Sequence, residues 1–127
     1  MNSPGNMADV LELMQKLIEY RYQKALHHQL MKAVDHSMLG IDVLVLIYHF
    51  ARVSEGDILE IGSFVGAATI AAGLGARDSG REKKIISIES GGRLKDHRLA
   101  TKYIFKDLKK NMARAGLLEA VTLISDI

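Results

Sequence analysis

Residues 1–52 carry their apolar side chains at helical spacing. The first amphipathic segment repeats them every three or four positions, at Val10, Leu13, Met14, Leu17 and Ile18. The pattern continues less regularly through Leu26 and Leu30 until Gly40 interrupts it, and Ile41 to Ala51 is predicted to be a more completely buried helix. We expect residues 1–52 to form an N-terminal helical segment that acts as a lid or in oligomerisation.

Beyond the turn at Ser54-Glu55-Gly56, short apolar runs of strand length alternate with helical segments. Strands are predicted at Asp57–Ile61, Lys84–Ile88 and Val121–Ile124. An Ala-rich helix is predicted over Val65–Leu74, with Gly73, Gly75 and Gly80 marking its end. The order strand, helix, strand, helix, strand is typical of parallel βαβ units. Residues 53–127 are therefore predicted to have an α/β fold with a Rossmann-like parallel sheet and flanking helices.

The second helix of this part is predicted to be long, to follow Gly91-Gly92 and to end at Gly116. Its apolar face holds Ile104, Leu108 and Met112. The opposite face is basic, with Lys95, Arg98, Lys102, Lys106, Lys109 and Lys110. We interpret this stripe as a solvated helix face rather than as a phosphate-binding surface.

Each predicted strand ends in glycine or polar residues: Gly62-Ser63, Glu89-Ser90 and Ser125-Asp126. Ligands of parallel α/β sheets bind at the carboxyl ends of the strands, so three candidate binding loops should lie along one edge. Glycines in the first bend let the backbone approach a ligand closely, and the amides of the following helix would face it. Glu89 could accept hydrogen bonds from both hydroxyls of a ribose, although an ordinary solvent-exposed strand end is the alternative.

Composition removes several classes of function. The formal net charge of +2 is too small to indicate a nucleic-acid partner, and the apolar stretch from Met38 to Phe50 is too short to span a bilayer. The absence of cysteine excludes disulfides and thiolate metal sites and fits a cytoplasmic protein. His27, His28, Asp35 and His36 match no established metal spacing, so we expect surface or capping roles and no metal site.

The run from Ile58 to Gly66, Ile-Leu-Glu-Ile-Gly-Ser-Phe-Val-Gly, resembles the first motif of class I S-adenosylmethionine-dependent methyltransferases, especially small-molecule O-methyltransferases of the caffeoyl-CoA and macrocin types. The resemblance covers about Ile41 to Ile127. Phe64 departs from the family, which has glycine there. Neither the nicotinamide fingerprint, which needs glycines at 62, 64 and 67, nor a P-loop, which needs Gly-Lys-Ser/Thr after the turn, is present.

The resemblance implies roles for six residues of this sequence. Gly62, Ser63 and Gly66 would face the methionine portion of S-adenosylmethionine, with Glu60 anchoring the loop nearby. Glu89 would bind the ribose hydroxyls, and Asp126 matches the position whose carboxylate approaches the adenine amino group. The implied activity is methyl transfer to a small-molecule acceptor, at a hydroxyl. No catalytic base is assigned, because the family's base usually follows the third strand.

The family's sheet has about seven strands, in which the first three have the order 3-2-1, whereas three strands are readable here. We therefore expect a truncated cofactor-binding half, or a homodimer that completes the sheet at the open edge of the Glu60 strand. The alternative function is a noncatalytic binding or assembly module that retains only the scaffold.

Overall fold

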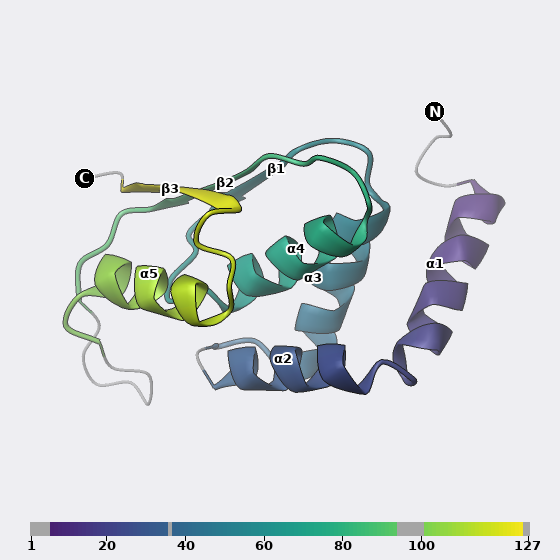
Figure 1. The fold of residues 1–127 in the computed structure, drawn as a ribbon, viewed down its shortest axis with the longest axis horizontal. Helices are drawn as coiled ribbons and strands as arrows, with labels where there is room; N and C mark the ends of the chain where they lie inside the picture. Colours follow the sequence, from purple (N-terminus) through teal and green to yellow (C-terminus); the bar gives the residue numbers. More distant parts are fainter. Residues whose placement is uncertain (1–5, 36, 94–100, 126–127) are drawn as a thin grey trace.

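A computed structural model describes residues 6–35, 37–93 and 101–125 (Figure 1). Three helices come first: α1 (Met7–Tyr20), α2 (Lys24–Val34) and α3 (Ile41–Val53). Strands and helices then alternate as β1 (Ile58–Ile61), α4 (Ala67–Asp78), β2 (Ile85–Glu89), α5 (Ile104–Arg114) and β3 (Val121–Ser125). The predicted α/β alternation is confirmed.

The three strands form one parallel sheet in the order β1-β2-β3. Glu60 lies opposite Ser87 in the register of β1 and β2, and Glu89 lies opposite Ser125 in that of β2 and β3. β2 is added beside β1, and β3 is added beside β2 at the same growing edge of the sheet. Right-handed crossovers therefore place α4 and α5 on the same face of the sheet. Figure 1 shows α3, α4 and α5 together on that face.

No described residue covers the opposite face of the sheet. Side chains alternate along the strands, so Ile58, Ile85 and Val121 point toward the helices while their neighbours point away. On β1, Leu59 and Ile61 are 64% and 77% exposed. Since parallel sheets are normally covered on both faces, this apolar surface is an unusual feature.

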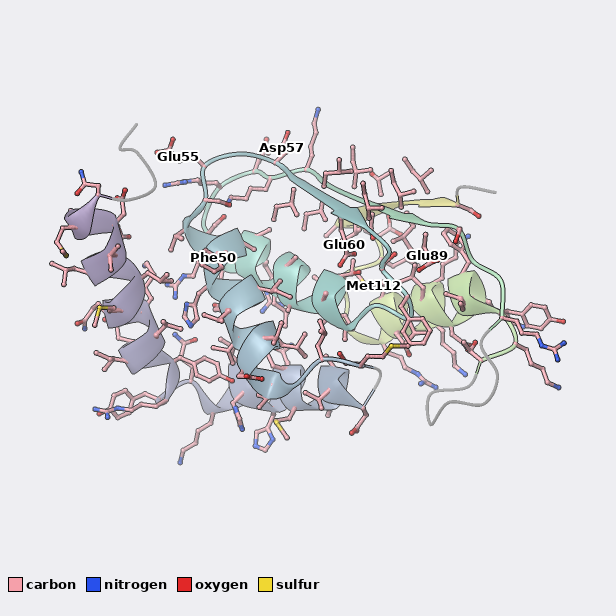
Figure 2. All side chains as sticks on the ribbon, turned by 180° about the vertical axis from the view of Figure 1, so that it is seen from behind. Phe50, Glu55, Asp57, Glu60, Glu89 and Met112 are labelled. Carbon is pink, nitrogen blue, oxygen red and sulfur yellow. The ribbon has the colours of Figure 1, made fainter. Side chains whose placement is uncertain are left out.

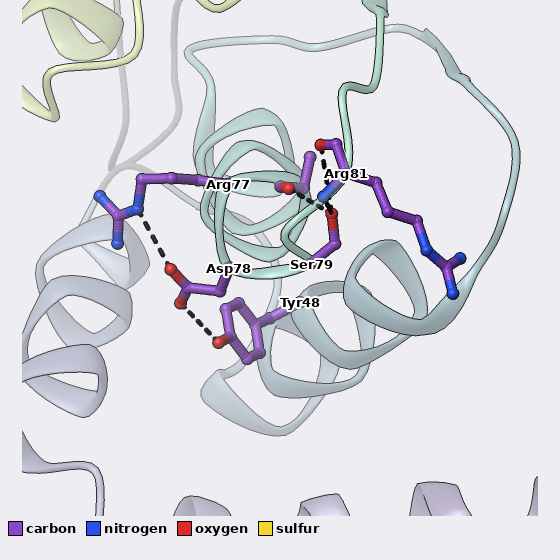
Figure 3. Close-up of polar contacts among 6 residues, drawn as sticks. Tyr48, Arg77, Asp78, Ser79 and Arg81 are labelled. Atoms are coloured by element: carbon purple, nitrogen blue, oxygen red, sulfur yellow. Dashed lines mark hydrogen bonds and ion pairs between the residues drawn. The ribbon is translucent and has the colours of Figure 1, made fainter.

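The tightest packing in the fold joins α3 to α4. Gly75 lies in the C-terminal half of α4, where a Cβ would collide with the carbonyl oxygen of Tyr48. The Tyr48 hydroxyl donates a hydrogen bond to Asp78 Oδ2 at 2.6 Å, which fixes the end of α4 against α3 (Figure 3). Burial and this hydrogen bond raise the pKa of Tyr48 far above its usual value.

Gly73 and Gly75 therefore do not mark the end of α4, as was predicted, whereas Gly80, with a φ of 72°, lies just beyond that end as expected. Gly73 and Gly75 are buried within the helix, which continues to Asp78. A glycine in a helix interior usually weakens it, but here the missing side chains let α3 approach Gly75 and Leu117 approach Gly73.

The N-terminal helices differ from expectation in their burial. α1 and α2 are separate helices, joined by Arg21 to Gln23, and no residue of α1 is buried. α3 was expected to be more completely buried than the preceding segment, but Leu46 and Phe50 are exposed and only one side packs on α4. The helices α2 and α3 nevertheless share a single core with α4, through Leu30, Leu44 and Leu74.

The long helix predicted after Gly92 is shorter than expected. Within the described residues, Thr101, Lys102 and Tyr103 are not helical, and α5 begins at Ile104, so Lys102 is not part of the helix. Lys95 and Arg98 lie outside the described residues. The predicted end is confirmed: Gly116 has a φ of 72°, and the amide of Leu117 bonds back to the Met112 carbonyl.

The helices of the described residues are all too short or too polar to cross a lipid bilayer.

Candidate functional site at the first strand-to-helix bend

The bend between β1 and α4 contains three residues with left-handed backbone angles. Gly62, Phe64 and Gly66 have φ values of 85°, 48° and 106°. Glycine adopts this region without cost, whereas Phe64 is strained there. At Gly66 a Cβ would lie 3.0 Å from Leu108 Cδ1, so α5 packs directly against the bend. Both predicted glycines are thus required by the path of the chain.

Glu89, at the end of β2, closes against this bend. Its Oε1 accepts a hydrogen bond from the Phe64 amide at 2.6 Å, and its Oε2 accepts one from the Gly91 amide at 2.9 Å. The side chain is 8% exposed. Oε2 also accepts a long hydrogen bond, of 3.4 Å, from the Ser90 hydroxyl. A carboxylate oxygen has two lone pairs, so Oε1 can accept one more hydrogen bond, whereas a ligand hydroxyl at Oε2 would replace that of Ser90. The sheet therefore brings the bend and the acid to the same place.

The hydroxyl of Ser63 has no hydrogen-bond partner within the described part of the chain. Ser63 is 4% exposed, and its Oγ is completely buried. An unpaired buried hydroxyl costs about 1–3 kcal/mol, so a polar ligand or a water molecule would be stabilised beside it. Ser63 also lies just before α4, whose N-terminal amides carry partial positive charge.

Glu60 faces the helices instead of the bend's outer side. Its carboxylate accepts hydrogen bonds from the hydroxyls of Ser87, at 2.6 Å, and Thr69. Ser87 and Thr69 are completely buried, so this cluster ties β1 and β2 to α4 between the sheet and the helix layer (Figure 2). Glu60 thereby fixes the position of the helix that follows the bend.

Asn111 is a supporting residue that the sequence analysis missed. It lies on α5, and its Nδ2 donates a hydrogen bond to the carbonyl of Val65 at 2.9 Å. This hydrogen bond ties the bend to α5. It is buried between Leu108 and Met112. A polar residue on the apolar face of a helix is the signal that would have identified it.

No family model matches this sequence, and no curated protein matches it either. Any function of the chain must therefore be inferred from the residues of the bend and their surroundings.

Five of the six predicted site residues lie around this bend: Glu60, Gly62, Ser63, Gly66 and Glu89. Asp126 lies outside the described residues. Among the described residues, no three histidine, aspartate or glutamate side chains form a group that could hold a metal ion. His27 is instead hydrogen-bonded through Nδ1 to the Tyr20 hydroxyl at 2.8 Å.

Neither of two cavities formed by described residues is lined by the bend itself. A shallow hollow of about 650 Å³ is lined by Gly92, Ile104 and Phe105, on the chain that leaves Glu89. A deeper cavity of about 370 Å³ lies among α2, α4 and α5.

Proposed function

We propose that this chain binds S-adenosylmethionine at the bend after β1 and supplies the cofactor-binding part of a methyltransferase. The observation that carries the proposal is the hydrogen bond between the Phe64 amide and the Glu89 carboxylate. It brings together two elements that, in the resembled enzymes, contact the methionine and ribose portions of one cofactor.

The residues at the bend suit such a cofactor. Gly62 leaves the backbone without a side chain where a ligand would approach it, and the space around its missing Cβ is open. The missing side chain of Gly66 faces Leu108 and allows α5 to pack against the bend. Ser63 offers a buried hydroxyl with no protein partner. Oε1 of Glu89 could accept one ribose hydroxyl, and Oε2 could accept the other in place of its long contact to the Ser90 hydroxyl.

The chain's own contribution would be positioning. When bound, the cofactor supplies an electrophilic methyl group on a sulfonium, and an enzyme accelerates its transfer chiefly by alignment with the acceptor. Glu60 and Asn111 would hold the bend rigid from two sides, and Ser63 would orient the polar end of the cofactor. Asp126 would approach the adenine amino group. We propose a small hydroxylated molecule as acceptor.

The uncovered sheet bears on how such a protein would be assembled. In the resembled fold, with strand order 3-2-1, further strands pair beside β1 and helices cover the second face. We propose that a second copy of the chain pairs along the free edge of β1 and buries Leu59 and Ile61, which are exposed in the single chain.

Calorimetric titration with S-adenosylhomocysteine tests the proposed function. We expect saturable binding that Glu89→Ala weakens more than tenfold, because hydrogen bonds to a charged group contribute about 1.5–3 kcal/mol each. Ser63→Ala is the second variant: since its hydroxyl has no protein partner, it should weaken binding without lowering stability.

Glu82→Ala is the matched control, because Glu82 is an exposed acid away from the bend. No binding by a folded wild-type chain would overturn the proposal and favour the noncatalytic module. If Glu89→Ala and Ser63→Ala both left the affinity for S-adenosylhomocysteine unchanged, the cofactor would have to bind at a site other than the bend.

A further inference from the structure

A second site is suggested by the cavity among α2, α4 and α5, on the side of the helix layer away from the sheet. Its volume of about 370 Å³ is within the range of small-molecule pockets. Its floor is apolar: Ile70 and Leu74 of α4 line it, and both are buried. The floor would accommodate an apolar body of one or two rings.

The rim of the cavity is polar and carries a net positive charge. Lys32 projects from the last turn of α2 and Arg114 from the last turn of α5, so cations of two helices converge on one opening. Asp35 is the single acid of the lining, which leaves a formal charge of +1 from two cations and one acid. In the described part of the chain neither Lys32 nor Arg114 has a carboxylate within ion-pair distance.

The negative ends of the two helices offset part of this charge, since a helix C-terminus carries about half an elementary charge. That effect is confined to the last turn and is screened by solvent, whereas Lys32 and Arg114 themselves line the cavity. An anionic group placed between Lys32 and Arg114 would be attracted by both.

Asn111 adds a buried polar group to the lining. Its Nδ2 is occupied by the Val65 carbonyl, and no described residue donates a hydrogen bond to its Oδ1. The cavity thus combines an apolar floor, one free acceptor and two cations at the rim. This combination fits an amphipathic molecule better than a bare inorganic anion.

We propose that this cavity binds a small apolar carboxylate, with its rings on Ile70 and Leu74 and its carboxylate between Lys32 and Arg114. The site is separate from the bend at Glu89 and does not depend on the proposed cofactor function.

Titration with 2-naphthoate, followed by amide chemical shifts in two-dimensional NMR, tests the proposal. We expect saturable shifts confined to the residues that line the cavity and their neighbours on α2, α4 and α5. The uncharged 2-naphthamide should bind more weakly, because it lacks the carboxylate.

The double variant Lys32→Gln/Arg114→Gln should weaken naphthoate binding about threefold to thirtyfold, as expected for two partly exposed charge contacts. Lys24→Gln/Lys110→Gln is the matched control, since it removes one exposed lysine from each of the same helices outside the cavity lining. Both variants should keep the wild-type amide dispersion.

Equal affinity of naphthoate for both double variants, or equal affinity of acid and amide for the wild type, would overturn the proposal. Shifts located on Leu59, Ile61 and Ile86 instead would assign the binding to the uncovered sheet face and would equally overturn it.

Discussion

The backbone amide of Phe64 lies 2.6 Å from Oε1 of Glu89 and donates a hydrogen bond to it. This contact joins the bend that follows β1 to the end of β2, so the Glu89 carboxylate is a hydrogen-bond partner of the strained bend. Phe64 has a φ of 48°, so the bend needs support from its surroundings. Glu89 supplies that support at the Phe64 amide, and Asn111 supplies it at the Val65 carbonyl.

Removing the Glu89 carboxylate should therefore destabilise the fold even without a ligand. We expect Glu89→Ala to lower the free energy of unfolding by about 2–3 kcal/mol, because a charge-assisted hydrogen bond to a buried amide is lost. Glu89→Gln should lose less, since its amide oxygen can still accept from Phe64. Urea denaturation measures both, and an unchanged midpoint for Glu89→Ala would contradict the role of this contact.

The hydroxyl cluster on Glu60 should contribute to stability in a similar way. Ser87→Ala removes one of two donors to a carboxylate that lies between the sheet and α4, and we expect a loss of about 1–2 kcal/mol in unfolding free energy. Ser90→Ala is the control, because Ser90 is exposed and its hydroxyl donates only a long hydrogen bond, of 3.4 Å, to Glu89 Oε2. Equal stability of the two variants would show that the Glu60 cluster contributes nothing measurable.

Replacing Gly75 by alanine should lower the stability of the fold, although helix propensity alone predicts that it would raise it. In an exposed helix interior Gly→Ala stabilises by about 1 kcal/mol. At Gly75 the added methyl group would meet the Tyr48 carbonyl oxygen and the Ala51 side chain, so we expect Gly75→Ala to destabilise by more than about 2 kcal/mol. Gly56→Ala, at a position with open space, should be nearly neutral in the same thermal unfolding measurement.

His49 should make stability depend on pH. Its ring is completely buried between Tyr20 and Tyr48, and both ring nitrogens lack partners in the described part of the chain. Burial, together with the charges of Arg52 and Lys16, lowers the pKa of His49 below its usual 6.5.

The unfolded chain therefore binds the proton more readily than the folded one. Neutral His49 contributes fully to the free energy of unfolding above about pH 6.5, the pKa of the histidine in the unfolded chain. This contribution is lost as the pH falls from that value toward the lower pKa of His49 in the folded chain. Unfolding free energies measured between pH 5 and pH 8 should decrease toward acid, and His49→Phe should reduce that slope. His28→Gln, at an exposed position, should keep it.

The sequence was sufficient to predict the α/β alternation and the residues of the bend, because both are encoded locally. Strand-length apolar runs ending in glycine or acid define β1 and β2. The meeting of the Phe64 amide with Glu89 follows once these strands are parallel neighbours, since their carboxyl ends lie at one edge.

Features that depend on contacts between distant segments were not predictable in the same way. Gly75 looked like a helix terminator, because nothing in its neighbourhood of the sequence reveals that the Tyr48 carbonyl lies against it. The segment of α3 was expected to be more completely buried because it is rich in apolar residues, but Leu46 and Phe50 are exposed. Asn111 acquires its role only when α5 is placed under the bend.

The free edge of β1 gives the last prediction. β1 pairs with β2 on one side and with no described residue on the other, and Leu59 and Ile61 are exposed beside that edge. A second copy related by a twofold axis would pair its β1 antiparallel to this one, and the dimer would cover part of the apolar sheet face of both copies.

Light scattering after size-exclusion chromatography should then give a dimer mass. Ile61→Lys should shift it toward the monomer, because a lysine placed there opposes pairing with the edge. Val10→Lys, on the exposed side of α1, is the control for removing an apolar surface residue and should leave the dimer intact. A wild-type chain that stays monomeric at high micromolar concentration would rule out the β1 interface.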